Sequence, residues 1–383
     1  MKDKIIIIGA NEFQNQLILK AKERGIEAHV FAWKDGSIGE YTADKFYPIS
    51  IIEKESILEE AKKISPNAVV SIASDLAMVT VNYIANSLQL VCNSNECTLI
   101  STNKFEMRKV FYKNNIPSPK FIYITKDTNL EELIIDYPVI VKPTDRSGSR
   151  GINKVYNLQE MKDAVKEAIE VSFNKEALIE EFAEGREFSV EYISENGKHN
   201  FLAITEKFTT GEPHFIETAH MQPARITREQ EEKIKEIIPQ ALTALKIKNG
   251  ASHSELKIDE NNNIKIIEIG ARMGGDCIGS DLVQISTGYD FVNMVIDIAI
   301  GEKLNFIKIS EPKVALIKFI FNKEDYEILQ SIKKTNNDKL YRISEIGDIE
   351  SRDVTDSSTR FGYFILSCNT VEEGLKLLNL DME

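Results

Sequence analysis

Hydrophobic and polar positions along the first hundred residues predict short buried strands that alternate with amphipathic helices. Apolar runs typical of strands lie at residues 4–10, 29–32, 47–49 and 67–72, and helical spacing follows at residues 15–24, 52–64 and from 75 to about 88. This alternation predicts a parallel sheet wound in βαβ units. The first strand-to-helix turn, residues 9–13, lacks GxGxxG spacing, so a dinucleotide site is poorly supported there.

The rest of the chain mixes strands and helices. We expect helices at residues 104–114, 158–171, 228–245 and 290–300, and strands at residues 137–143, 177–182, 187–193 and 201–208. Pro239 lies inside the third of these helices and should kink it. Beyond residue 313 we expect a smaller α+β region, with strands at residues 315–321, 339–343 and 361–367 and a terminal helix.

The most informative stretch is a predicted β-hairpin with arms at residues 253–258 and 264–269. A two-residue turn at Asn261 and Asn262 would place Glu255 directly opposite Glu268. The two side chains would then share one face, with Cβ atoms roughly 4.5–5.5 Å apart. Mg²⁺ in nucleotide sites takes one or two carboxylates together with phosphate oxygens, so this pair suits a metal. The alternative is that both glutamates point to solvent.

The residues after the hairpin favour the metal interpretation. Arg272 follows Glu268 by four positions, and Gly274 and Gly275 come next. A cation and bare backbone amides would therefore lie beside the carboxylates, as phosphate chemistry requires. The alternative for Arg272 is a structural pair with Asp276 that shapes the glycine loop.

Two earlier segments offer phosphate and nucleotide contacts. Lys142 ends a predicted strand, and the SGSRG loop at residues 147–151 could bring backbone amides close to a phosphate. The connector after residues 177–182 could present backbone groups to an adenine edge, and Glu187 could accept ribose hydroxyls. A plain turn and an ordinary hairpin are the alternatives for these segments.

Two further polar residues have two interpretations each. Asp75 follows a predicted strand, where open α/β sheets bind ligands, but it also suits a helix N-cap. His220 lies with Glu217 in an otherwise uncharged run, and a lone histidine is more often structural than functional.

Composition limits the partners. The chain has 383 residues, which allows two or three domains, and a formal net charge of −13. This charge argues against non-specific nucleic-acid binding, which needs a basic surface. The 4 cysteines form no CxxC pair, and no apolar run approaches the ~18 residues of a membrane span. We expect a cytoplasmic protein that binds small molecules and neither nucleic acid nor membrane, with a homodimer as an open alternative.

Together the motifs resemble the ATP-grasp superfamily of carboxylate–amine ligases. The order is a lysine on a helix, Val-Lys-Pro, a glycine loop, Glu-Glu-Phe-x-x-Gly-x-Glu, and two carboxylates on adjacent strands. The EIGARMGGD run at residues 268–276, with HSE at 253–255, is most similar to L-amino-acid ligases and carbamoyl-phosphate-synthase-like relatives. The resemblance implies an α/β and α+β fold. Its parts are a Rossmann-like domain at residues 1–98, an ATP-grasp domain of two α+β subdomains at 99–302 with a small mobile subdomain at about 120–182, and a C-terminal α+β subdomain at 303–383.

The resemblance also implies roles for the motif residues. ATP binding is implied for Lys104, Lys142, Ser147, Gly148, Ser149, Gly151, Glu180, Glu181, Phe182, Ala183, Glu187 and Lys207. Substrate binding is implied for Glu217, His220, His253, Arg272, Gly274, Gly275 and Asp276, and a catalytic role for Arg272 and Lys142. Glu255 and Glu268 would bind Mg²⁺, with Mn²⁺ as an alternative metal. One departure is Gly270, where many family members carry an asparagine that completes the metal site.

The implied reaction joins a carboxylate to an amine through an acyl phosphate and releases ADP and phosphate. An amino acid or related small acid would be the substrate, although the sequence names neither the acid nor the amine. One alternative is bicarbonate activation, as in carbamoyl-phosphate or carboxyaminoimidazole ribonucleotide synthesis. Another is a nucleotide-binding regulator without catalysis.

Overall fold

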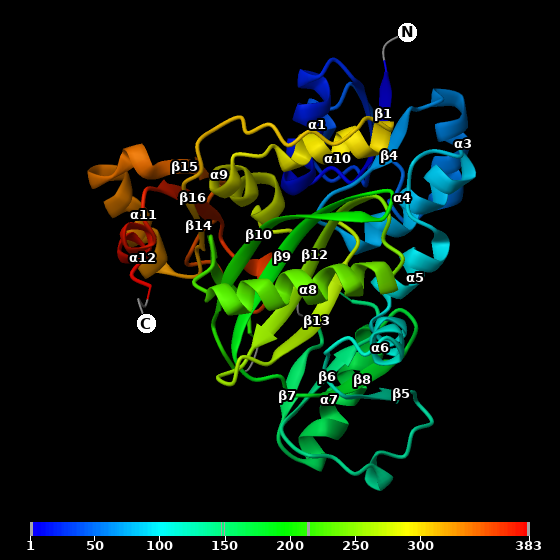
Figure 1. Ribbon diagram of the computed structural model, residues 1–383, viewed down its shortest axis with the longest axis vertical. Coiled ribbons are helices and arrows are strands. Elements are labelled where there is room, and N and C mark those ends of the chain that lie inside the picture. Colours follow the sequence, from blue (N-terminus) through cyan, green and yellow to red (C-terminus); the bar gives the residue numbers. More distant parts are fainter. Residues whose placement is uncertain (1–2, 147, 149, 213–214, 381–383) are drawn as a thin grey trace.

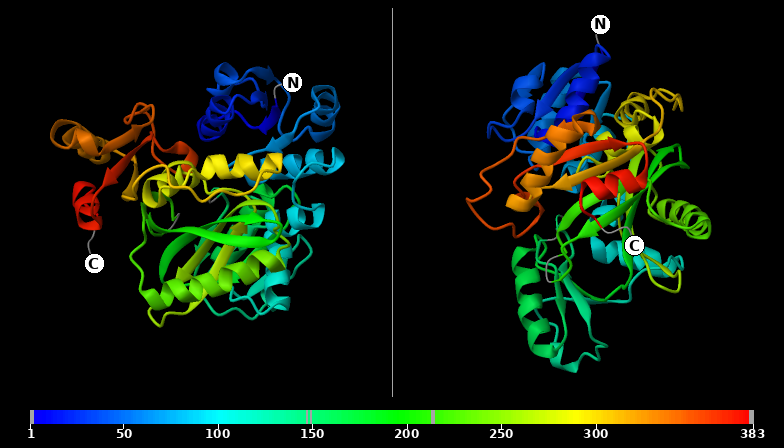
Figure 2. Two further views of the ribbon diagram at one scale, coloured as in Figure 1. Left: turned by 45° about the horizontal axis from the view of Figure 1, so that its top comes forward. Right: turned by 90° about the vertical axis from the view of Figure 1, so that its left-hand side faces the viewer.

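Three β-sheets with their helices make up the computed structural model, which describes residues 3–146, 148, 150–212 and 215–380. In Figure 1 the sheet nearest the N-terminus lies at the top, the largest sheet in the middle, and a small sheet at the bottom. The right-hand view of Figure 2 also places the small sheet at the end of the molecule away from the N-terminus. Across the described ranges, no helix has the length and apolar character that a membrane span requires.

The N-terminal sheet is parallel, as the sequence pattern predicts. Its strands run in the order β3-β2-β1-β4. They are β1 (Lys4–Ile8), β2 (Glu27–Phe31), β3 (Lys45–Tyr47) and β4 (Ala68–Val70), with helices α1 (Glu12–Glu23), α2 (Gly39–Thr42), α3 (Lys54–Ile64) and α4 (Asp75–Ser87). The N-cap of α4 is Ser74, whose side chain accepts from Ala77 N. The N-cap interpretation of Asp75 is therefore wrong, because Asp75 begins the helix itself and its carboxylate is free to bind elsewhere.

The small sheet is antiparallel, in the order β5-β8-β6-β7. Its strands are β5 (Phe121–Ile124), β6 (Val139–Pro143), β7 (Asn153–Val155) and β8 (Ala177–Glu181), and α7 (Leu158–Val171) packs on it. Met161, Ala164, Val165 and Ala168 of α7 are buried against the sheet. Their i, i+3, i+4, i+7 spacing is the reason that the sequence predicts this helix to the residue. Helices α5 (Asn95–Thr102) and α6 (Lys104–Lys113) lead into this part of the chain.

The largest sheet has eight strands in the order β13-β12-β9-β10-β11-β14-β16-β15. They are β9 (Arg186–Glu195), β10 (Lys198–Thr209), β11 (Glu217–Gln222), β12 (Gly250–Ile258), β13 (Ile264–Gly270), β14 (Val314–Phe319), β15 (Leu340–Ile343) and β16 (Tyr363–Cys368). The helices are α8 (Arg228–Ala244, with Pro239 inside), α9 (Val283–Thr287), α10 (Phe291–Ile300), α11 (Lys323–Thr335) and α12 (Val371–Leu377). Shorter helical turns lie at Leu130–Glu132, Ile278–Leu282, Asn337–Lys339 and Ser357–Thr359.

The C-terminal strands continue this sheet and do not form a separate one. β11 pairs with β14 from Ala219↔Lys318 to Gln222↔Ala315. Met221 of β11 lies in the same buried cluster as Leu316 and Phe364. The predicted domain boundary at residue 302 stays a prediction. The hydrogen-bonded ladder between β11 and β14 joins the two parts of the chain that this boundary would separate.

The N-terminal sheet and the large sheet share a hydrophobic core. Val70 of β4, Val295 of α10 and Ala251 of β12 belong to one buried cluster. α10 lies between the two sheets in Figure 1. This shared core holds the end of β4 close to the β12–β13 hairpin, which carries Glu255 and Glu268.

Candidate active site

The β12–β13 hairpin pairs Glu255 with Glu268, as the sequence predicts. The turn, however, is not the predicted two-residue turn. Ile258 pairs with Ile264, so residues 259–263 form a longer turn, in which Asp259 N donates to Asn263 O at 3.1 Å. The register shifts by one residue between Leu256↔Ile266 and Glu255↔Glu268, which leaves Ile267 as a β-bulge. The observed turn shifts the register by one residue from the predicted one, and the extra residue of the bulge shifts it back. The predicted pair is therefore confirmed, although the predicted turn is wrong.

Each glutamate of this pair binds a lysine. Lys104 Nζ donates to Glu268 Oε1 at 2.6 Å, and Lys207 Nζ donates to Glu255 Oε1 at 2.9 Å. Burial alone would raise the pKa of Glu255, but the Lys207 ammonium and His253 hold that pKa well below its usual range. The alternative that both carboxylates point to open solvent is therefore wrong.

Lys207 lies at the centre of three carboxylates. Its Nζ lies 2.9 Å from Glu187 Oε1, 2.9 Å from Glu255 Oε1 and 3.5 Å from Glu217 Oε1. Burial would lower the pKa of Lys207, but Glu187 and its neighbours raise it well above the usual value, so the side chain is a cation. The Lys207 ammonium group thus joins the predicted ribose contact Glu187, the predicted metal ligand Glu255 and the predicted substrate contact Glu217.

Lys142 is buried against Glu180, with Nζ 2.7 Å from Glu180 Oε2. Burial lowers the pKa of Lys142, and the neighbouring Glu180 opposes that effect. The fully buried guanidinium of Arg108, on α6, lies on the other side of Glu180, with Nε 2.9 Å from Oε1. Arg108 was not predicted from the sequence, because nothing in a basic helix distinguishes a buried arginine from a solvated one.

One cavity of about 140 Å³ gathers most of the residues predicted to bind nucleotide. Its lining includes Lys104, Lys142, Glu180, Glu181, Phe182, Ala183, Glu187, Lys207, Phe215, Glu217, Lys257, Glu255 and Glu268. Lys154 Nζ lies 3.7 Å from the centre of the Phe182 ring. Of the predicted loop, Ser147 and Ser149 lie outside the described residues. Gly148 lines a neighbouring cavity, and Gly151 has φ +69° and packs against Val171.

That neighbouring cavity, of about 100 Å³, contains Arg272. It is lined by Asp75, Lys104, Arg146, Gly148, Ile152, Glu217, His253, Glu255, Glu268, Gly270 and Arg272. Lys104, Glu217 and both glutamates of the hairpin pair line this central cavity and the nucleotide cavity alike. The carboxylate pair therefore lies at the junction of the two.

Arg272 forms a two-pronged ion pair with Asp75 from the N-terminal sheet. Arg272 Nε donates to Asp75 Oδ1 at 3.0 Å and Nη2 donates to Oδ2 at 2.8 Å. Burial would raise the pKa of Asp75, but Arg272 holds it below its usual value. The structural alternative, a pair between Arg272 and Asp276, is wrong. Gly270 leaves room for the observed pair, since a Cβ at this position would lie 2.8 Å from Asp75 Oδ1.

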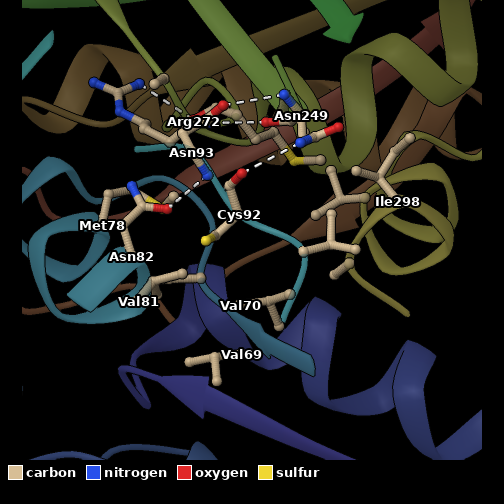
Figure 3. Close-up of a pocket in the computed structure, with 18 residues that line it drawn as sticks. Val69, Val70, Met78, Val81, Asn82, Cys92, Asn93, Asn249, Arg272 and Ile298 are labelled. Carbon is tan, nitrogen blue, oxygen red and sulfur yellow. Dashed lines mark hydrogen bonds between the residues drawn. The ribbon is translucent and has the colours of Figure 1, made fainter. Parts of the chain in front are cut away.

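A small cavity of about 50 Å³ is lined by Arg272, by Val69 and Val70 of β4 and by the start of β12 (Figure 3). At its edge, Asn93 Nδ2 donates to Asn249 O at 2.8 Å, and Asn249 Nδ2 donates to Cys92 O at 3.2 Å. These bonds and the Asp75–Arg272 pair tie the N-terminal part of the chain to the hairpin.

Glu191 is a second buried residue that was not predicted from the sequence. Its Oε1 contacts His253 Nδ1, and its Oε2 accepts from Gly274 N at 3.0 Å. Burial would lower the pKa of His253, but Glu191 raises it to about 9. A Cβ at Gly274 would lie 2.8 Å from both Glu191 Oε1 and His253 Nδ1, so this close contact requires glycine. Glu187 and Glu191 lie four positions apart in one strand, so their side chains face the same side of the sheet. This alternation is the sequence signal from which Glu191 could have been found.

His220 and Asp276 lie together but away from the lining of the cavities described above. His220 Nε2 is 3.6 Å from Asp276 Oδ2, and the guanidinium of Arg360 holds Asp276 with distances of 3.0 and 2.7 Å. Burial would raise the pKa of Asp276, but Arg360 holds it far below its usual value. Substrate binding by these two residues stays a prediction, and the Asp276 carboxylate is occupied by Arg360. Gly275, the remaining glycine of the loop, has room for a side-chain carbon, since a Cβ there would lie 3.8 Å from Ala73 Cβ, an ordinary van der Waals distance.

The donor set at the junction fits a hard cation. Glu255 and Glu268 present carboxylate oxygens from paired positions, which is the ligand type that Mg²⁺ prefers. Within the described ranges, no group of three or more His, Cys, Asp or Glu side chains is arranged for a metal. A metal here would therefore be coordinated by the two carboxylates and by oxygens of a bound ligand. Lys104 and Lys207 would first have to release the carboxylates that they bind.

Known proteins share this fold and parts of this sequence. Residues 135–281 match the family model described as ATP-grasp domain. The carbamoyl phosphate synthase large chain of Thermoanaerobacter sp. (strain X514) is 26% identical over 269 residues, which cover 69% of this chain and 24% of that one. The alanine–anticapsin ligase of Bacillus subtilis (strain 168) is 26% identical over 220 residues, which cover 51% of this chain and 46% of that one.

Among solved structures, the L-amino acid ligase from Bacillus licheniformis matches with a TM-score of 0.84 and 21% identity, covering 99% of this chain and 96% of that one. This chain spans about a quarter of the length of the carbamoyl phosphate synthase large chains that it matches. The predicted fold class and the predicted resemblance are both confirmed. Residues 135–281 are thus similar in sequence to an ATP-grasp domain, and the shared fold extends over nearly the whole chain.

Proposed function

We propose that the protein is an ATP-dependent, ADP-forming carbon–nitrogen ligase. The observation that carries the proposal is the junction of the two cavities. Lys104, Glu255 and Glu268 line both the cavity that suits a nucleotide and the cavity that contains Arg272. A phosphoryl group that passes between a nucleotide and an acid needs a charged junction of this kind, because such enzymes work by positioning and electrostatics.

The larger set of predicted nucleotide residues would bind ATP. The backbone of Glu181–Ala183 would face the adenine, and Glu187 would accept the ribose hydroxyls. Lys104, Lys142 and Lys207 would neutralise phosphate oxygens, each released from the carboxylate that it now contacts. Gly148, and the predicted loop around it, would cover the phosphates.

Glu255 and Glu268 would hold Mg²⁺, or Mn²⁺ in its place. A bound divalent cation would offset negative charge on the phosphates and help to orient them. Gly270 supplies no side chain where an asparagine would add a ligand, so the two carboxylates would be the protein's contribution.

In the proposed reaction, a substrate carboxylate oxygen attacks the γ-phosphorus of ATP, and ADP leaves. The amine nitrogen then attacks the carbonyl carbon of the acyl phosphate, phosphate leaves, and the nitrogen loses a proton. Asp75 occupies one edge of the Arg272 guanidinium, through Nε and Nη2. The remaining N–H groups on the opposite edge would hold the acyl phosphate, in the bidentate manner that suits planar oxygen pairs.

The proposed substrate class is an amino acid or related small acid. Relatives named as amino acid ligases support this choice. His253, Glu217 and the backbone at Gly274 line or adjoin the central cavity and would contact the substrates. A homodimer and a cytoplasmic location stay proposals.

Bicarbonate activation is the second candidate, favoured by the similarity to carbamoyl phosphate synthase over 269 residues. The two candidates are separated by ADP release with ATP and Mg²⁺ over a panel of amino acids, hydroxy acids and bicarbonate, each with and without amines. The ligase proposal expects release that needs both an organic acid and an amine. Release with bicarbonate alone would favour the second candidate. Nucleotide binding without release under every condition would leave a regulator.

A further inference from the structure

The β-bulge at Ile267 determines which side chain faces Glu255. On the turn side of the bulge, Leu256 pairs with Ile266, and that register without a bulge would place Ile267 opposite Glu255. Glu268 would then point to the other face of the sheet, because a slip of one residue reverses every side chain of a strand. While Ile267 is present in the strand, the carboxylate pair therefore exists only if the bulge is kept.

β13 is an edge strand, so β12 is its only strand partner in the described sheet. Further contacts of the bulged segment come from α6 and the residues after it. Ile266 N donates to Pro117 O at 2.8 Å, and Ile269 N lies 3.4 Å from Met107 Sδ. Between them, Arg108 Nη2 donates to Ile267 O at 2.6 Å. The carbonyl of the bulged residue is thus bound by a buried charge, and a buried carbonyl is costly to leave unpaired.

Arg108 is 1% exposed and binds two groups at once. Besides the bulge carbonyl, its guanidinium contacts both carboxylate oxygens of Glu180, at 2.9 and 3.2 Å. Glu180 in turn contacts Lys142 at 2.7 Å. A planar guanidinium donates from several nitrogens in fixed directions and so can bind a carbonyl and both oxygens of a carboxylate together, whereas a lysine ammonium donates all of its N–H groups from one nitrogen.

We propose that Arg108 is a positioning residue, which fixes the bulge at Ile267 and so keeps Glu268 opposite Glu255 in the metal-binding orientation. This proposal rests on the proposed function, in which the Glu255–Glu268 pair binds the metal. Arg108 itself lies outside the lining of the described cavities, so it acts through Glu268 and Glu180. It couples the strand that carries the second carboxylate to the strand that carries the phosphate lysine.

The first test compares Arg108→Lys with a control, Arg342→Lys, by calorimetric ADP binding with and without Mg²⁺. Arg342 also binds a buried carboxylate, that of Asp281, at 2.7 and 3.1 Å, but it lies in the C-terminal region. A lysine at 108 can still neutralise Glu180, so ADP affinity without Mg²⁺ should change less than about threefold. The increase in ADP affinity that Mg²⁺ produces should fall at least tenfold, and it should be unchanged in Arg342→Lys. An unchanged Mg²⁺ effect in Arg108→Lys, or an equal loss in both variants, would overturn the proposal.

The second test uses deletion of Ile267, which removes the bulge and leaves Glu255 opposite Glu268 in a regular ladder. Ile267 lines the nucleotide cavity, so the deletion can change ADP affinity by itself, and the Mg²⁺ effect is taken relative to the Mg²⁺-free affinity of the same variant. The proposal expects this ratio to be kept in the deletion variant, and expects Arg108→Lys to cause no further loss when combined with it. If Arg108→Lys alone does not fold, the single deletion decides: a lost Mg²⁺ effect in a folded deletion variant would overturn the proposal.

The third test needs no nucleotide and so separates this proposal from the ligase proposal. Hydrogen exchange at residues 264–270 should be faster in Arg108→Lys than in the parent protein, while exchange at residues 250–254 of β12 stays the same. Equal exchange at residues 264–270 would refute the positioning role even if turnover is lost. Normal positioning by this test, together with no ADP release from any acid, would refute the ligase reaction instead.

Discussion

Arg272→Lys tests whether Arg272 serves the reaction or only the structure. Arg272 joins the hairpin to the N-terminal sheet through two contacts with Asp75, at 3.0 and 2.8 Å, and donates to Met273 O at 3.2 Å. A lysine keeps the charge and one contact with the carboxylate, but it loses the second contact and the opposite edge of the guanidinium. The substitution therefore removes geometry and keeps charge.

Two magnitudes follow from these contacts. Loss of one charged hydrogen bond in a site this enclosed lowers the free energy of unfolding by about 1.5–3 kcal/mol. Loss of a donor that stabilises developing charge lowers kcat by ~10²-fold or more. The affinity for an ATP analogue should stay within about threefold, because Arg272 lines the central cavity and not the nucleotide cavity.

Arg360→Lys is the matched control. Arg360 holds Asp276 by the same two-pronged geometry, at 3.0 and 2.7 Å, but it lies outside the lining of the described cavities. We expect a similar loss of melting temperature in both variants and a loss of single-turnover ADP formation in Arg272→Lys alone. Equal turnover per folded molecule in the two variants, or a normal rate in Arg272→Lys, would remove Arg272 from the mechanism.

Three further predictions concern the metal, the phosphates and the glycine loop. Glu268→Gln removes a charge and keeps the shape of the side chain, so ADP formation per folded molecule should fall by ~10²-fold; normal turnover at saturating Mg²⁺ and ATP would show that the metal assignment is wrong. Lys142→Met should weaken both ATP-analogue and ADP binding, measured by calorimetry, by at least tenfold. Unchanged affinities would show that Lys142 serves only as the ion-pair partner of Glu180. Gly274→Ala should lower the free energy of unfolding by about 1–3 kcal/mol, measured in urea, because the added Cβ would lie 2.8 Å from His253. Gly275→Ala, with its nearest atom at 3.8 Å, should be tolerated, and equal losses in the two glycine variants would contradict the packing argument.

Local periodicity predicted the parts of the fold that depend on local sequence. The bounds of α7 follow from four apolar positions at helical spacing, and the structure has the same bounds. α5 was missed because its sequence, NECTLIST, has no clear apolar stripe and its packing depends on neighbouring helices. The C-terminal strands were expected, but their place beside β11 depends on pairing between distant segments, which no local pattern contains.

The site was predictable where it follows from pairing within one hairpin and from motif order. The Glu255–Glu268 pair emerged because both residues belong to adjacent strands. The bulge that corrects its register is bound by Arg108, more than 150 positions earlier in the chain, so the sequence of the hairpin alone predicts the wrong turn. The Asp75–Arg272 pair joins residues 197 positions apart, so the sequence left two interpretations open for each side chain.

The continuity of the eight-stranded sheet limits how this chain can be divided or exchanged with its relatives. A protein cut at residue 302 would lose β14, and the backbone of β11 would become a bare edge, with Met221 exposed from a core that it shares with the C-terminal region. An exposed edge of this kind invites pairing with other chains. Grafts that exchange substrate preference between relatives should therefore carry the C-terminal strands along with β11, because the two regions are one unit of stability and would be inherited together.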